Sequence, residues 1–346
     1  MKIRLVYSSA FSCVLLMSMA AVPSRANMLI VPTYDTTIAS DSNHVAIENI
    51  IQQAIDVYDS TFGNNLTATI YFSEMPGGLG LSDTAFYTNS YSTFHTDLQS
   101  VNANPSAIAG LNANGGNSAT NPVTGSSTID VKSANGRAVG ISGDAAACVP
   151  TFNATFQTNV CSIGSSGAYD GVIGLNTSFT FPPNSNDGSH YDLLSVVEHE
   201  IDEVLGLGSS LPNCDQNAKT PCTSVGAANP SPEDLFRYQA NGSRTSLANT
   251  ACGSLGTAFF SYSGVGDIAQ FNTTCNGDDF GDWLNNGTPR VQDAVGTPGT
   301  GPTLGPAELD ALSAIGYQIV VPEPGTFALV GLGIAALAAY RRRRRA

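Results

Sequence analysis

Basic, apolar segments occupy both ends of this 346-residue chain, and they limit the folded part to the residues between them. Residues 1–26 combine an apolar run with three basic residues and no acid, and residues 321–346 combine an apolar run with a terminal cluster of arginines. Targeting and processing segments have such compositions and do not belong to a fold. The domain that must fold and act is therefore residues 27–320.

The first segment has the layout of a secretory signal peptide. Lys2 and Arg4 precede an apolar run from Ala10 to Val22, and Pro23 ends that run. Small residues then lead to Ala26, after which we expect cleavage. A buried N-terminal helix is the alternative, and it fits poorly with this charge layout and the abrupt change to polar sequence.

The last segment has three parts in a fixed order. Pro322, Glu323 and Pro324 precede an apolar run from Phe327 to Tyr340, and five arginines, Arg341–Arg345, follow it. This order resembles the bacterial PEP-CTERM sorting signal. The resemblance implies a Gram-negative source, transient inner-membrane anchoring by a short transmembrane helix, and removal of the tail by exosortase-type processing machinery. It also implies delivery to the outer envelope, cell surface or extracellular matrix. An ordinary C-terminal anchor is the alternative, and either interpretation takes the protein out of the cytoplasm.

The domain between the two segments is strongly acidic. The whole chain has 14 Lys and Arg against 28 Asp and Glu, and eight of the basic residues lie in the end segments. Residues 27–320 therefore carry a net charge of about −21, a field that repels phosphate backbones and acidic lipid surfaces. We expect no nucleic-acid partner. Since 42% of the chain is hydrophobic and only 12% is charged, disorder is also excluded.

Six cysteines remain after residue 26, an even number typical of disulfide-bonded exported proteins. No two of them form a CxxC pair, which argues against a thiolate metal site. Other pairings are possible, and the hypothesis is that neighbours pair. Neighbour pairing would join Cys148 to Cys161, Cys214 to Cys222 and Cys252 to Cys275.

Apolar periodicity and turn residues predict a single α+β domain with a loop-rich C-terminal half, because neither an internal repeat nor a clean linker is present. Residues 103–128 are rich in Asn, Gly and Ser and are predicted to form a flexible surface loop. The predicted helices are Ile47–Tyr58, Tyr87–Leu98, Tyr191–Leu205 and Pro306–Ile315. The predicted strands are Ala68–Phe72, Ser127–Lys132, Ala138–Ile141 and Gly171–Phe181, the last as an edge strand.

The helix predicted at Tyr191–Leu205 contains the candidate metal ligands. His199 and Glu203 are four residues apart and so share one helix face, and Glu200 lies about 100° further round the helix. In H-E-x-x-H zinc hydrolases two side chains so placed hold Zn²⁺, and the intervening Glu is the general base. Here Glu203 replaces the second histidine, and carboxylate is an acceptable zinc ligand. The pattern predicts His199 and Glu203 as zinc ligands and Glu200 as the catalytic base.

This helix and several later motifs resemble a PEP-CTERM-associated zinc metalloprotease family over most of residues 45–318. The resemblance implies a metzincin-like fold and zinc-dependent hydrolysis of a peptide or protein substrate. By analogy with that fold, the substrate would join strand Gly171–Phe181 as an additional strand. The later motifs are Glu233–Tyr238, Phe259–Tyr262, Gly277–Trp283, Val291–Ala294 and Glu308–Tyr317.

The sequence departs from the metzincin pattern at the third ligand. The corresponding position is Ser209, a poor zinc ligand, and no methionine follows the helix to form a Met-turn. The third ligand is therefore left open. The candidates, chosen for charge and chain reach, are Asp234, Glu233, Asp215 and His190.

A second acidic cluster, Asp278, Asp279 and Asp282, lies beside two glycines. Clustered oxygens suit Ca²⁺, but the EF-hand pattern is incomplete, and a turn with solvated aspartates is the alternative interpretation.

Together these patterns predict an exported zinc metalloendopeptidase that hydrolyses peptide bonds with a metal-activated water. The alternative is a non-catalytic cell-surface or biofilm-matrix protein on a degenerate protease scaffold. In that case His199, Glu200 and Glu203 would be an ordinary solvated helix face.

Overall fold

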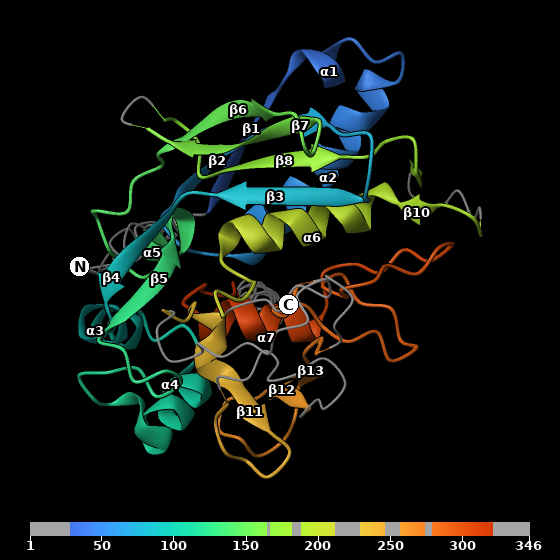
Figure 1. Ribbon diagram of the computed structural model, residues 1–346. Coiled ribbons are helices and arrows are strands. Elements are labelled where there is room, and N and C mark those ends of the chain that lie inside the picture. The colour runs from blue at the N-terminus through green and yellow to red at the C-terminus, as the bar shows by residue number, and fades with distance from the viewer. Residues whose placement is uncertain are drawn as a thin grey trace, which may run out of the picture.

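The computed structural model describes residues 28–164, 167–181, 188–211, 229–245, 257–273 and 279–320. In these parts the chain forms a mixed α/β domain. Helix α6 (Leu193–Leu205) lies between a four-stranded sheet and a loop-rich C-terminal half (Figure 1). The predicted mixture of helices and strands is thus confirmed.

The sheet is mostly parallel and ends in one antiparallel edge strand. Its strand order is β1 (Leu29–Tyr34), β2 (Thr67–Glu74), β8 (Gly171–Leu175) and β3 (Gly80–Thr84). The first three strands are parallel, and β3 runs antiparallel to β8. The prediction of an edge strand from Gly171 to Phe181 is therefore wrong, because β8 stops at Leu175 and is flanked by β2 and β3. Its fully buried Gly-Val-Ile-Gly-Leu sequence is typical of an interior strand.

Two helices pack against the same face of the sheet. Helix α2 (His44–Thr61) confirms the helix predicted at Ile47–Tyr58 and buries its apolar stripe. At its C-terminal end, the buried Tyr58 hydroxyl contacts Oδ1 of Asp202 and the backbone oxygen of Glu198 on α6, both at 2.7 Å. These contacts fix α6 against α2.

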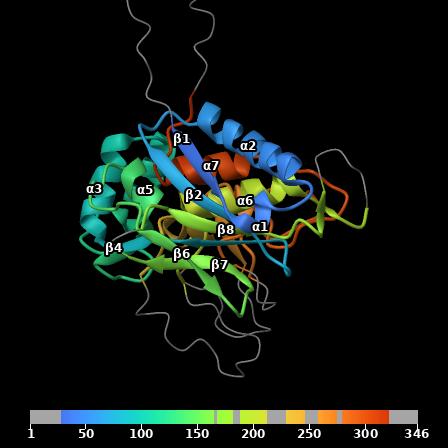
Figure 2. The same ribbon diagram turned by 90° about the horizontal axis from the view of Figure 1, so that it is seen from above.

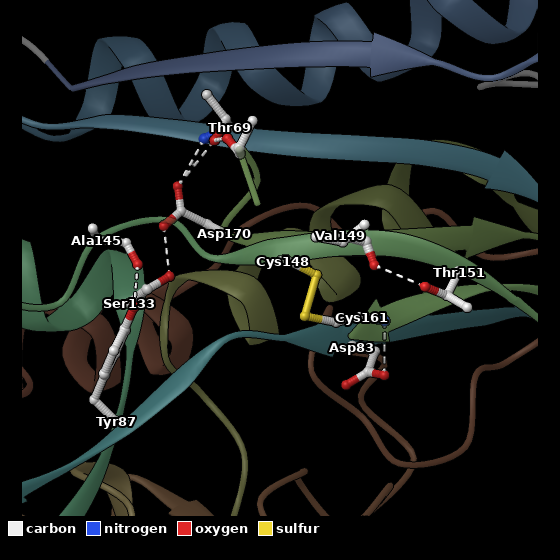
Figure 3. The surroundings of a disulfide bond; sticks show 11 residues. Thr69, Asp83, Tyr87, Ser133, Ala145, Cys148, Val149, Thr151, Cys161 and Asp170 are labelled. Atoms are coloured by element: carbon white, nitrogen blue, oxygen red, sulfur yellow. Dashed lines mark hydrogen bonds between the residues drawn. A yellow bond between two sulfur atoms is a disulfide. The ribbon is translucent and has the colours of Figure 1, made fainter. Parts of the chain in front are cut away.

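The opposite face of the sheet carries the hairpin of β6 (Cys148–Asn153) and β7 (Thr158–Ile163) (Figures 1 and 2). The predicted disulfide between Cys148 and Cys161 links its two strands. Figure 3 shows the side chain of Asp83, on edge strand β3, accepting a hydrogen bond from the Cys161 backbone N–H at 3.0 Å. The hairpin therefore supports β3 from the side away from α6.

The C-terminal half is built around a small antiparallel sheet of β11 (Arg237–Gln239), β12 (Ala258–Phe260) and β13 (Ala269–Gln270). Trp283 is fully buried against this sheet and packs on rings from β12 and the residue after β13. Its indole N–H donates to Glu308 on α7 (Pro306–Ala314) at 3.1 Å. Helix α7 confirms the helix predicted at the end of the domain.

Three local predictions are wrong. The predicted helix Tyr87–Leu98 begins with strand β4 (Phe86–Ser90), whose pairing with β5 (Thr128–Lys132) delays the start of α3 (Tyr91–Val101). Residues 103–128 contain a short helix, α4, that begins at a proline with Asn104 as its side-chain cap. The strand predicted at Ala138–Ile141 is instead the end of α5 and a turn.

The remaining elements are short. They are α1 (Thr36–Ala39), α3 (Tyr91–Val101), α4 (Pro105–Leu111), a π-helical turn (Asn112–Gly116), β5 (Thr128–Lys132), α5 (Ser133–Ala138), β9 (Thr180–Phe181), β10 (Tyr191–Asp192) and a 3₁₀ turn (Glu233–Phe236).

The other two predicted disulfides, Cys214–Cys222 and Cys252–Cys275, lie outside the described residues, as do the predicted signal peptide and the predicted transmembrane helix. Within the described ranges, no helix is long and apolar enough to cross a membrane.

Candidate metal centre

Both ends of helix α6 are fixed by specific contacts. Asp192 caps the N-terminus by accepting a hydrogen bond from the Ser195 backbone N–H. At the other end, Gly206 has φ +136°, which L side chains rarely adopt. The Lys132 ammonium donates to the backbone oxygens of Glu203 and Leu207 at 2.7 and 2.6 Å, a charge that favours a helix C-terminus. The helix is therefore held at a fixed position under the sheet.

The structure brings the two predicted ligands together on α6. Nε2 of His199 lies 3.6 Å from Oε1 of Glu203, as the four-residue spacing requires. Both side chains are largely buried, with relative exposures of 18% and 14%. These residues are therefore not an ordinary solvated helix face.

Asp282 is the third member of this cluster. Its Oδ2 lies 3.9 Å from Nε2 of His199, and one ligand atom from each of His199, Glu203 and Asp282 lies within 4.8 Å of the others. Tetrahedral zinc with bonds of about 2.0–2.2 Å places its ligand atoms roughly 3.3–3.6 Å apart. The distances from Nε2 of His199, 3.6 and 3.9 Å, are at or slightly above this range, so small side-chain movements would bring the nitrogen and the two carboxylate oxygens onto one zinc ion with a fourth position left for water or substrate.

Each of the three side chains has its remaining polar atom held by another group. Nδ1 of His199 donates to the Val291 backbone oxygen at 2.9 Å, which leaves Nε2 with its lone pair facing the cluster once the ring is neutral. Ser82 on β3 donates to Oε2 of Glu203. Gln292 donates to Oδ1 of Asp282 at 2.8 Å. Supporting contacts of this kind orient the ligands of metal sites.

Asp282 reaches the cluster because its backbone is fixed on both sides. The Asn272 backbone N–H donates to the Asp282 backbone oxygen at 2.7 Å. The backbone N–H of the adjacent Trp283 donates to the Gln292 oxygen, and the Trp283 oxygen accepts from the Ala294 N–H. Burial of the Trp283 indole then anchors the segment in the core. The packing of the C-terminal half thus places Asp282 beside α6, although the two are far apart in the sequence.

The predicted base, Glu200, lies beside the cluster and against edge strand β3. It is 5% exposed. A Cβ atom at Gly80 would overlap Oε1 of Glu200 and would lie 2.7 Å from its Cδ. Glycine at this position of β3 therefore makes room for the carboxylate.

The cluster concentrates negative charge around one imidazole. Burial raises the pKa of Glu200 well above its ordinary value, and Glu203 raises it further. Burial also opposes ionisation of Glu203, yet contact with His199 lowers the pKa of Glu203 to about 2. Burial lowers the pKa of His199, but Asp282 and Glu203 outweigh it and raise that pKa well above its ordinary value. Without metal, a proton on His199 balances the carboxylates, and a bound cation would displace it.

The third ligands proposed from the sequence have other roles or lie elsewhere. Oε2 of Glu233 accepts from the Gly208 N–H at 2.6 Å, and Asp234 accepts from the Ser209 hydroxyl at 2.7 Å. These two acids hold the loop after α6, and they are not in the metal cluster. His190 is also outside the cluster, and Asp215 is not among the described residues.

Calcium at Asp278, Asp279 and Asp282 stays a prediction. Asp278 lies outside the described ranges, Oδ1 of Asp279 accepts from the Gly281 N–H, and Asp282 belongs to the cluster with His199. Because calcium prefers oxygen ligands only, an imidazole nitrogen in this cluster favours zinc.

The cluster opens into a cleft of about 540 Å³. The lining includes Leu79–Ser82, from edge strand β3 and the turn before it, together with Arg290, Val291 and residues 293–297. In Figure 1, β3 runs directly above α6. A cleft bounded by a strand edge and a candidate metal cluster suits an extended chain molecule.

The sequence did not reveal the groups that complete the site. The sequence predicts Asp282 only as a candidate calcium ligand and as part of the Gly277–Trp283 motif. Ser82 belongs to no motif, and the Val291–Ala294 motif assigns no role to Gln292 or to the Val291 oxygen. The signal in the sequence that points to these residues is the order of two motifs after the helix, GDDFGDW and VQDA. The two segments meet at Trp283 in the structure. Their spacing did not show which aspartate faces His199.

Comparison with known proteins identifies one segment. Residues 320–345 match the family described as the PEP-CTERM protein-sorting motif, as predicted for the C-terminal tail. The motif implies recognition by exosortase processing machinery and export to the cell envelope. No curated protein and no solved structure matches the chain. The interpretation of residues 28–320 therefore rests on their own geometry.

Proposed function

We propose that this chain is an exported zinc metallopeptidase with a metzincin-like arrangement of its site. One observation supports this most strongly: His199, Glu203 and Asp282 converge, and each has its other polar atom held by a separate partner. An accidental cluster of surface acids lacks such support on every member, whereas metal sites have it.

The chemistry follows from the donor set and from Glu200. A zinc ion held by His199, Glu203 and Asp282 would supply Lewis acidity for the scissile carbonyl and acidify the attacking water. Glu200 would accept the proton of that water and deliver it to the leaving amine. Burial raises the pKa of Glu200 above its ordinary value, which makes its carboxylate a stronger proton acceptor than an exposed glutamate.

The strand order of the sheet decides which strand a substrate peptide would join. The backbone of β3 lies at a sheet edge and lines the cleft, so an extended peptide would pair with β3 rather than with the interior strand β8. The peptide would then pass over Glu200 and the cluster. The substrate class is an extracellular peptide or protein, in keeping with the export signal.

Cleavage of casein by the zinc-loaded protein tests this function. We expect Glu200→Gln to lower the cleavage rate at least about 100-fold while zinc stays bound, because the amide accepts no proton. Glu48→Gln, on α2 and outside the lining of the cleft, is the matched control and should leave the rate unchanged. Zinc binding without any cleavage would favour the alternative, a non-catalytic surface or matrix protein.

A further inference from the structure

The lining of the cleft contains one guanidinium group. Among the described residues that line the cleft, Arg290 is the only Arg or Lys, whereas six of them are acids. Those acids are Asp192, Glu200, Glu203, Asp279, Asp282 and Asp293. A single arginine in so acidic a cleft would be expected to pair with one of them.

Arg290 forms no salt bridge with any of these acids; burial raises the pKa of its neighbour Asp293, and the charge of Arg290 offsets only part of that rise. Its guanidinium forms no ion pair or hydrogen bond with the part of the chain that the structure describes, and its Nη1 is buried without a partner. Asp293 is its neighbour in the turn, but Oδ2 of Asp293 accepts from the Arg290 backbone N–H at 2.9 Å, and Oδ1 is also buried without a partner. Arg290 is half-buried, and a guanidinium without a protein partner keeps N–H donors for a ligand in the cleft.

Arg290 directly precedes a residue that holds one of the candidate metal ligands. The next residue, Val291, accepts the hydrogen bond from Nδ1 of His199. The backbone of residues 290–293 is tied to the buried Trp283 through Gln292. The guanidinium is therefore carried by a segment whose position relative to His199 is fixed.

We infer that Arg290 is a specificity-determining residue that binds a carboxylate of the substrate, so that the cleft prefers a peptide with an acidic side chain beside the bond over the cluster. This inference rests on the proposed function for the identity of the substrate. A guanidinium offers paired N–H donors that match a carboxylate, and such charged hydrogen bonds are about twice as strong as neutral ones. The surrounding acids repel carboxylates elsewhere in the cleft, so the preference is confined to the position that faces Arg290.

The test measures peptide binding and does not need turnover. The full-length Glu200→Gln protein is titrated with fluorescein-labelled alanine-based heptapeptides that carry one Glu at successive positions, and with matched peptides that carry Gln. We expect one Glu position to bind at least about tenfold more tightly than its Gln counterpart. Adding Arg290→Gln should reduce this ratio to within about twofold, whereas Arg290→Lys should keep part of it.

Asp293→Asn is the matched control, because it removes the neighbouring charge and keeps the arginine. It should preserve or increase the preference for Glu. Equal binding of Glu and Gln peptides, an absence of binding, or a preference that survives Arg290→Gln in a protein with a normal thermal transition would each overturn the inference. Failure to cleave casein would count against the peptidase proposal alone, because this binding assay uses a variant without the base.

Discussion

At the residue scale, Gly80 shows how closely the edge strand and the helix fit. Because a methyl group at this position would overlap the Glu200 carboxylate, we expect Gly80→Ala to displace Glu200 and lower peptidase activity at least tenfold, with zinc binding retained. Gly77→Ala is the control, since a Cβ there meets nothing within 4 Å. Casein cleavage and zinc content of the two variants are compared. Full activity in Gly80→Ala would contradict the placement of Glu200.

Glu198 gives a pH dependence of stability. Burial raises its pKa from 4.5 to about 7, while the hydrogen bond from the Leu304 N–H opposes the rise. Between these values the native state holds a proton that the unfolded state releases, so stability falls as pH rises from about 4.5 to 7. The shift corresponds to about 3 kcal/mol. Urea unfolding across this range should show a smaller fall for Glu198→Gln than for the parent protein, and identical slopes would contradict the prediction.

The contact within the helix could be predicted from the sequence because it is local. His199 and Glu203 are four residues apart on one helix, so their approach follows from helix geometry. Asp282 joins them through the packing of Trp283 and a hydrogen bond from Gln292, neither of which has a periodic signal. The third ligand is positioned by tertiary packing, so the spacing of residues along the sequence could not predict it.

At the element scale, the β6–β7 hairpin is the part that the disulfide controls. Cys148→Ser with Cys161→Ser removes a link that closes a loop of sequence separation 13, which costs about 3 kcal/mol by loop-closure entropy. The Cys161 backbone also holds Asp83 on β3. We therefore expect a lower Tm and faster hydrogen exchange in both the hairpin and β3. Unchanged exchange in β3 would show that the hairpin does not support the edge strand.

Strand order is the element-level feature that the sequence did not predict. The predicted strand Ala68–Phe72 lies within β2, whereas the predicted edge strand Gly171–Phe181 is a strand only as far as Leu175 and lies inside the sheet. The residues of β3, Gly-Leu-Ser-Asp-Thr, are half-buried and have no strong strand pattern. Their pairing is fixed by β8 on one side and by contacts with α6 through Gly80 and Ser82. An edge strand of weak propensity is placed by its neighbours.

At the scale of the whole molecule, α6 joins two halves that come from different parts of the chain. Strand β3 supplies Ser82 and strand β5 supplies Lys132 to its C-terminal end, and the C-terminal half supplies Asp282 and the Val291 oxygen. Part of the acidic character seen in the composition lies in this interface, where Glu200, Glu203 and Asp282 surround His199. The arginine-rich tail, by contrast, belongs to the sorting motif.

The convergence of three ligands on α6 is the central claim, and zinc titration of the metal-free protein tests it most directly. We predict stoichiometric binding that Asp282→Asn weakens at least about 100-fold. Asp279→Asn should leave it nearly unchanged, because Asp279 lines the same cleft outside the cluster and its amide variant can still accept from Gly281. No zinc binding at neutral pH, or Asp282→Asn binding zinc as tightly as the parent protein, would contradict it.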